Sequence, residues 1–152
     1  MARPTLRNVV LDTTDVSRLA RFYRDLLDWS FHPDNDREDA TWQVLVAPDG
    51  FRLAFQRAER VEPTTWPDPQ VPQQIHLDWQ LATRAGLDEL HARALQLGAT
   101  LRMDQAGDPE EPLRVYVDPG GHTFCLFTHD VPHDVPHDVT GDVIHDVTGD
   151  GS

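Results

Sequence analysis

The feature that most constrains the fold of this chain is a turn-and-strand motif that occurs twice. Residues 48–55 read Pro-Asp-Gly-Phe-Arg-Leu-Ala-Phe, and residues 119–126 read Pro-Gly-Gly-His-Thr-Phe-Cys-Leu. In each copy a Pro/Gly turn precedes a segment whose side chains alternate between two faces, as in the second strand of a hairpin. A strand and an amphipathic helix precede each copy. The sequence therefore predicts one strand–helix–three-strand module written twice, and two such modules can enclose one pocket.

Hydrophobic periodicity and capping residues place the elements of the first module, which spans 6–57. Apolar residues recur at helical spacing after Asp15, a typical helix N-cap. The predicted elements are a strand over 6–13, a helix from Asp15 to about Asp28, a short strand over 29–32, and a hairpin of 41–47 with 51–57.

A proline-rich linker over 58–73 separates the modules, because four prolines exclude a regular element there. Trp66 lies in its middle and is expected either to anchor the linker against the core or to overhang the pocket. The second module spans 74–128. Its predicted elements are a strand over 74–81, a helix capped by Thr83 and stopped by Gly98, a strand over 100–103, and a hairpin of 113–117 with 122–127.

The last segment, 129–152, repeats His-Asp-Val and is expected to be disordered, because its prolines and polar spacing do not support a packed element. Its histidines and aspartates offer at most weak metal binding without fixed geometry. Without this tail, residues 1–128 contain 13 basic and 20 acidic residues. An acidic domain with no basic stripe argues against binding to nucleic acid or to an anionic membrane surface.

The rest of the composition favours a cytoplasmic protein of a single domain, 1–128. The chain has 152 residues, enough for one core, and its one cysteine, Cys125, excludes an intrachain disulfide. No apolar run has the length of a membrane span, and the N-terminus lacks the pattern of a secretion signal. All 13 basic residues are arginines, so a Schiff-base lysine mechanism is excluded.

Several segments, in this order, resemble the glyoxalase/bleomycin resistance/dioxygenase superfamily, also called the vicinal oxygen chelate superfamily. They are 8–12 (Asn-Val-Val-Leu-Asp), 22–27 (Phe-Tyr-Arg-Asp-Leu-Leu), 75–78 (Ile-His-Leu-Asp), 97–99 (Leu-Gly-Ala) and 115–122 (Val-Tyr-Val-Asp-Pro-Gly-Gly-His). The closest resemblance is to its glyoxalase-like domain branch, and it covers 6–128. It implies an α+β fold of two βαβββ modules, each a half-barrel, with a pocket between them.

In metal-dependent members of this superfamily, the ligands lie on the first and last strands of each module. The resemblance places Asn8 and His76 at the first-strand positions and Cys125 where the family typically has Glu. The remaining position is Ala54 if the internal repeat is followed, or Gln56 if metal-binding relatives are followed. The ligands of a metal, if one is bound, would then be Asn8, Gln56, His76 and Cys125.

These four residues favour no metal, because only His76 is a strong ligand and no carboxylate stands among them. If such a site does bind a metal, we expect a divalent ion, Zn, Ni, Fe or Mn. Asp78 shares the face of His76 and is expected either to act as an acidic donor or to form a charge-assisted hydrogen bond. Cys125 is open to two interpretations, a small apolar filler or a pocket residue.

The sequence-based hypothesis is a pocket that binds a small organic molecule, in the manner of metal-free drug-binding members such as bleomycin resistance proteins, which are usually homodimers. His76 is the candidate catalytic base. The alternative is a metal-dependent lyase of the glyoxalase type, an isomerase or a dioxygenase. The residues predicted to contact the ligand are Asn8, Trp42, Phe55, Gln56, His76, Asp78, Phe124 and Cys125.

Overall fold

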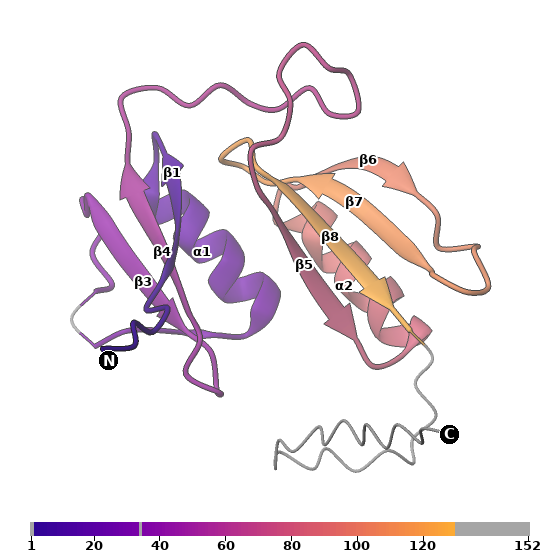
Figure 1. Ribbon diagram of the computed structural model, residues 1–152, viewed down its shortest axis with the longest axis horizontal. Coiled ribbons are helices and arrows are strands. Elements are labelled where there is room, and N and C mark those ends of the chain that lie inside the picture. Colours follow the sequence, from indigo (N-terminus) through magenta and orange to yellow (C-terminus); the bar gives the residue numbers. More distant parts are fainter. Residues whose placement is uncertain (1, 34, 130–152) are drawn as a thin grey trace, which may run out of the picture.

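The computed structural model describes residues 2–33 and 35–129 and contains two consecutive βαβββ modules (Figure 1). The α+β fold predicted from the repeat is thereby confirmed. The tail from residue 130 onward, for which disorder was predicted, lies outside the described residues. The first module contains β1 (Val9–Thr13), α1 (Val16–Leu27), β2 (Ser30–Phe31), β3 (Trp42–Val46) and β4 (Arg52–Arg57); the second contains β5 (His76–Leu81), α2 (Arg84–Gln96), β6 (Thr100–Asp104), β7 (Leu113–Val117) and β8 (Thr123–Thr128).

The two sheets have the same topology. Their strand orders are β1-β4-β3-β2 and β5-β8-β7-β6, and in each sheet the first and last strands of the module pair in parallel. The other pairs are antiparallel. The helix of each module supplies the crossover that a parallel pair requires. The strand of the turn-and-strand motif is therefore β4 in the first sheet and β8 in the second, and the two strands occupy the same position in the strand order.

Both helices begin and end where their capping residues predict. Asp15 accepts a hydrogen bond from the backbone N–H of Arg18 at 3.0 Å, and Thr83 accepts one from Gly86 at 3.1 Å. Helix α1 ends at Asp28, which adopts a left-handed conformation, and Gly98 has a φ of 101° just after α2. Among the described residues, no helix combines the length and the apolar character needed to cross a bilayer.

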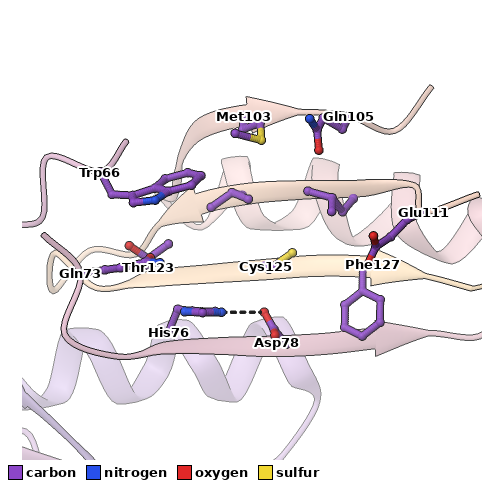
Figure 2. A pocket seen from close by; sticks show the side chains of 12 residues that line it. Trp66, Gln73, His76, Asp78, Met103, Gln105, Glu111, Thr123, Cys125 and Phe127 are labelled. Carbon is purple, nitrogen blue, oxygen red and sulfur yellow. Dashed lines mark ion pairs between the residues drawn. The ribbon is translucent and has the colours of Figure 1, made fainter. Parts of the chain in front are cut away.

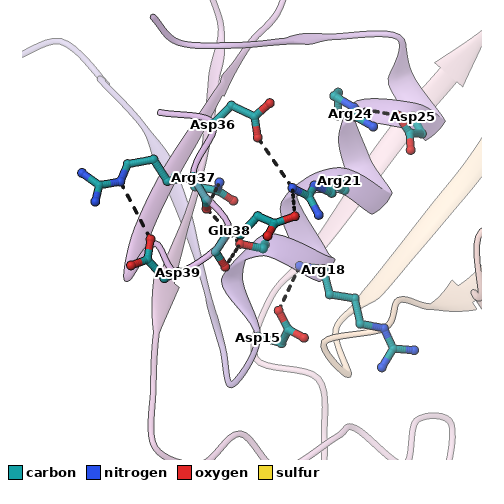
Figure 3. Close-up of polar contacts among 11 residues, drawn as sticks. Asp15, Arg18, Arg21, Arg24, Asp25, Asp36, Arg37, Glu38 and Asp39 are labelled. Carbon is teal, nitrogen blue, oxygen red and sulfur yellow. Dashed lines mark hydrogen bonds and ion pairs between the residues drawn. The ribbon is translucent and has the colours of Figure 1, made fainter. Parts of the chain in front are cut away.

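Polar contacts tie the first turns of α1 to the loop that precedes β3 (Figure 3). The Ser17 hydroxyl donates to the backbone carbonyl of Glu38 at 2.7 Å. The Arg21 guanidinium lies 3.6 Å from the Glu38 carboxylate and 4.0 Å from that of Asp36. Because these ion pairs are exposed, each contributes only about 0–1 kcal/mol, and they fix the path of the loop more than the stability of the module.

The modules share one core, in which α1 packs against both sheets. Tyr23 of α1 stacks on Phe55 of the first sheet, with ring centroids 5.8 Å apart, and contacts Phe124 of the second sheet at 6.1 Å. All three side chains are fully buried. The Tyr23 hydroxyl donates to the buried carboxylate of Asp118 at 2.7 Å. Helix α1 is therefore the element that joins the two modules.

The β7–β8 turn forms the other half of this junction. Its Gly121 carbonyl accepts a hydrogen bond from the backbone N–H of Thr64 in the linker, at 3.2 Å. The His122 ring donates through Nε2 to the backbone carbonyl of Asp12 on β1 at 2.7 Å. A Cβ atom on Gly120 would lie 2.7 Å from Cδ2 of Leu19 on α1. The second copy of the motif thus contacts the linker, β1 and α1, and side chains larger than hydrogen do not fit at its tip.

Candidate functional site

A pocket of about 320 Å³ lies on the face of the second sheet that points away from α2 (Figure 2). We call it the second-module pocket. Its size is at the lower end of the range for small-molecule sites. The strand residues that line it are His76 and Asp78 on β5, Met103 on β6, Leu113 and Val115 on β7, and Thr123, Cys125 and Phe127 on β8; the loop residues are Trp66, Gln73, Gln105 and Glu111.

Strand alternation decides which side chains reach this pocket. On β8, Thr123, Cys125 and Phe127 line it, while Phe124 and Leu126 between them lie in the core. On β5, His76 pairs with Thr123 and Asp78 pairs with Cys125. Two residues that the sequence placed at the pocket, Phe55 and Phe124, therefore lie elsewhere. Both belong to the faces that pack on the helices, and both are fully buried in the core.

His76 and Asp78 form a polar pair at the rim of the pocket. His76 Nε2 lies 3.5 Å from Asp78 Oδ1, and the two side chains are 45% and 54% exposed. At this distance the contact is longer than a typical hydrogen bond, so both roles predicted for Asp78 stay predictions. A carboxylate beside an imidazole orients the ring, and an oriented imidazole is able to accept a proton from a bound molecule.

Cys125 lies at the centre of the pocket, 9% exposed. Burial raises the pKa of its thiol to about 11, and the negative charges of Asp78 and Glu111 add to the shift. The thiol is therefore protonated at neutral pH, where it acts as a weak donor and not as a thiolate nucleophile. The shift also indicates that both carboxylates act on the same point in the pocket.

Two polar atoms at one end of the pocket have no hydrogen-bond partner in the part of the chain that the structure describes. Thr123 is 3% exposed, and its Oγ1 makes no hydrogen bond among the described residues. The same holds for Oε1 of Gln73, which also lines the pocket. Buried polar atoms are nearly always satisfied by protein, water or ligand. These two atoms are therefore sites where a bound molecule would gain hydrogen bonds.

Two of the predicted residues of the first module lie around a different cavity. Asn8 and Trp42 line a hollow of about 240 Å³, which we call the first-module hollow; its other lining residues are Arg7, His32, Asn35, Val44 and Arg52. Gln56 is exposed at the end of β4, opposite Trp42 in register, and lines none of these cavities. The sequence predicted one pocket containing all the site residues. The structure divides them between two faces.

A third cavity, of about 300 Å³, does lie between the modules. It is lined by residues of β1, the linker and the β7–β8 turn, among them Asp12, Glu62 and His122. It contains none of the residues predicted to bind ligand, although it shares Gln73 and Thr123 with the second-module pocket. A cavity therefore does lie between the modules, but the predicted site residues His76, Asp78 and Cys125 line the second-module pocket.

The residues present do not form a metal site. Asn8 borders the first-module hollow, whereas His76 and Cys125 line the second-module pocket. Within residues 2–33 and 35–129, no group of three or more His, Cys, Asp or Glu side chains is placed to hold a metal ion. A catalytic zinc site usually needs three good protein ligands, and His76 and Cys125 supply only two at this pocket. No step of metal chemistry is therefore assigned to these residues.

The pocket residues that the sequence analysis missed are of two kinds. Thr123 and Phe127 share a face with Cys125, so the alternation that identified Cys125 also pointed to them. Trp66 lies half-buried at the pocket, which was the second of the two positions considered for it. Gln73 and Glu111 lie in loops, and no periodicity in the sequence reports where a loop side chain points.

The fold defines a protein of paired βαβββ modules, with a cavity on the face of the second sheet. A sequence profile for the glyoxalase-like domain matches residues 8–127, and the chain belongs to this family. No curated protein matches the sequence.

Solved structures share the fold. A glyoxalase/bleomycin resistance protein/dioxygenase family enzyme from Burkholderia phytofirmans has a TM-score of 0.64 at 16% identity, over 81% of this chain and 97% of that one. The fosfomycin resistance protein FosX from Mesorhizobium loti has a TM-score of 0.62 at 16% identity, over 86% and 94%. FosX from Listeria monocytogenes, solved with Mn(II) and a dihydroxypropylphosphonic acid, has a TM-score of 0.61 at 15% identity, over 85% of this chain and 91% of that one. Such identities establish the fold and not the reaction.

Proposed function

We propose that the protein binds a small organic molecule in the second-module pocket. The observation that carries this proposal is the pair of buried, unpartnered polar atoms, Thr123 Oγ1 and Gln73 Oε1, at a pocket with apolar and aromatic walls. A mostly apolar cavity with a few converging polar groups is the usual form of a small-molecule site. Where the bound molecule is transformed, His76 is the candidate general base, because it lines the pocket 3.5 Å from the Asp78 carboxylate.

We also propose that the protein is a homodimer in which the first-module hollow of one copy covers the second-module pocket of the other. Charge complementarity supports this arrangement. The hollow carries Arg7 and Arg52, and the loops that border the pocket carry the exposed Asp68 and Asp108, which do not line it. The pocket is open on the side away from its sheet, so a second copy would enclose the ligand.

Ligand-induced stabilisation tests the binding proposal, because a molecule that binds only the folded state raises the midpoint of thermal unfolding. The screen uses a library of aromatic, cationic, neutral and anionic small molecules. Leu113→Trp would fill the pocket, since Leu113 lines it and is only half-buried. Leu6→Trp is the matched control at an exposed site outside the pocket. Stabilisation that is equal in both variants would contradict binding in this pocket.

The homodimer is tested by light scattering after gel filtration. Arg7→Glu and Arg52→Glu are expected to shift the protein towards monomer, while Arg60→Glu, an exposed linker residue, leaves its mass unchanged. A monomeric wild type at all concentrations would contradict the dimer.

Metal analysis tests the metal-dependent alternative. It uses protein purified without chelator or nickel resin. Stoichiometric Zn, Ni, Fe or Mn that is lost in His76→Ala would overturn the metal-free mode of binding proposed here.

A further inference from the structure

The charged side chains that line the second-module pocket are unbalanced. Asp78 and Glu111 are acidic, and no arginine is among the lining residues. His76 is the one basic group, and it lies against Asp78. Among the described residues, Glu111 forms no ion pair with an arginine or a histidine within 4.0 Å. Within one copy of the chain, a bound molecule would therefore meet a carboxylate that no cation among the described residues neutralises.

Asp78 lies beside Cys125 in the middle of the pocket, and Glu111 lies towards the end that Phe127 lines. In Figure 2, Glu111 lies next to Phe127, and Asp78 lies on β5 with its carboxylate turned towards His76. Asp78 pairs in register with Cys125, and the backbone carbonyl of Pro112, next to Glu111, accepts a hydrogen bond from Thr128, next to Phe127. Both carboxylates also raise the pKa of the Cys125 thiol between them. Two negative charges and an aromatic face together attract an organic cation.

The opposite end of the pocket offers hydrogen-bond acceptors without charge. Thr123 Oγ1 and Gln73 Oε1 are buried and unpartnered there, below the Trp66 ring (Figure 2). Thr123 is more than nine-tenths buried. Between the two ends the walls are apolar, formed by Met103 and Val115. A ligand that uses the whole pocket therefore has a positive charge at one end, an apolar body and a hydrogen-bond donor at the other end.

We infer that the second-module pocket selects small organic ammonium compounds, with the ammonium group between Asp78 and Glu111, the apolar body along Val115 and a terminal hydroxyl at Thr123. This inference rests on the proposed function and names its ligand class. It requires no reaction and no second copy of the chain, since all these residues lie in one module.

Four related probes test the inference by isothermal titration calorimetry. Tyramine has an ammonium group and a phenol hydroxyl; phenethylamine lacks the hydroxyl, 4-ethylphenol lacks the ammonium, and 3-(4-hydroxyphenyl)propionate reverses the charge. Tyramine is expected to bind most tightly, at least about tenfold more tightly than 4-ethylphenol, because charge-assisted contacts exceed neutral ones. The propionate is expected not to bind. Raised salt concentration weakens the binding of both amines and not of 4-ethylphenol.

Two variants locate the contacts. Glu111→Gln removes the unpaired charge. It is expected to weaken the binding of tyramine about fivefold and to leave the affinity for 4-ethylphenol unchanged. Glu110→Gln is the matched control, because Glu110 is adjacent, acidic and exposed but does not line the pocket. Thr123→Val replaces the buried hydroxyl by a methyl group of similar size. In that variant tyramine and phenethylamine are expected to bind equally.

The outcomes distinguish this inference from the proposed function. The selection of cations is overturned if tyramine and 4-ethylphenol bind with equal affinity, or if Glu111→Gln and Glu110→Gln lose the same affinity for tyramine. Neither result contradicts ligand binding in this pocket. The same conclusion follows if no amine binds while the library screen finds neutral or anionic ligands that Leu113→Trp excludes. If neither the amines nor the library stabilise the protein, the proposed function fails as well.

Discussion

The two copies of the turn-and-strand motif supply their own control for a test of the module junction. Gly50 and Gly121 occupy equivalent positions and have nearly the same backbone conformation, with φ of 90° and 94°. Their surroundings differ. A Cβ atom on Gly50 would have no neighbour within 4 Å, whereas one on Gly121 would lie 2.9 Å from the Cα of Pro63 in the linker. Substitution by alanine therefore separates backbone strain from contact with the linker.

The expected costs follow from this geometry. A left-handed backbone at a residue with a Cβ costs about 1–2 kcal/mol, and this is the whole effect expected for Gly50→Ala. In Gly121→Ala the new methyl group also displaces the Pro63 backbone. Overpacking of this kind costs about 1–3 kcal/mol more, so the total for Gly121→Ala is about 2–5 kcal/mol.

Urea unfolding of the wild type and both variants measures these costs, with tryptophan fluorescence and circular dichroism as independent probes. The free energies of unfolding can be compared if each transition is two-state and the slope of free energy against urea concentration is the same in all three proteins. Equal destabilisation by the two substitutions would refute this reasoning, because it would mean that the second turn makes no close contact with the linker.

Two further predictions concern the shared core and the pocket. Tyr23→Phe removes the hydroxyl that donates to the buried Asp118 carboxylate and should lower the free energy of unfolding by about 1.5–3 kcal/mol at neutral pH. Burial raises the folded-state pKa of Asp118, so its charged form is disfavoured and the stability it contributes falls as pH rises. The Tyr23 hydroxyl stabilises the charged carboxylate and so offsets part of this loss of stability. The destabilisation caused by Tyr23→Phe should therefore shrink as the pH falls through the folded-state pKa of Asp118. A destabilisation that stays constant from pH 7 to 4 would contradict this. Because the Cys125 pKa is about 11 instead of 9.0, iodoacetamide should alkylate it about 100-fold more slowly at pH 8 than in urea, and a rate that levels off near pH 9 would disprove the shift.

Most of the fold could be predicted from sequence because its signals are local. Asp15 and Thr83 begin the two helices, Asp28 and Gly98 end them, and Pro/Gly turns join the hairpins. These residues act on backbone within a few positions of themselves, so one sequence is enough to detect them. The repetition of the whole pattern then indicated that both modules have the same topology.

The site was predicted less completely, for two physical reasons. Alternation assigns Phe124 and Cys125 to opposite faces of β8 but does not say which face packs on a helix, so both were expected at the pocket. In addition, Trp66, Gln73 and Glu111 reach the pocket from loops whose paths depend on tertiary contacts such as that between Thr64 and Gly121. No local pattern encodes such a path.

The linker both joins the modules and forms one wall of the pocket, through Trp66 and Gln73. Two residues before Trp66, Thr64 is hydrogen-bonded to the β7–β8 turn. A molecule that binds against Trp66 therefore also restrains the segment that holds the two halves together. Occupancy of the pocket and protection of 58–73 from proteolysis are thermodynamically linked, and protease digestion of that segment would report ligand binding without a label or a known reaction.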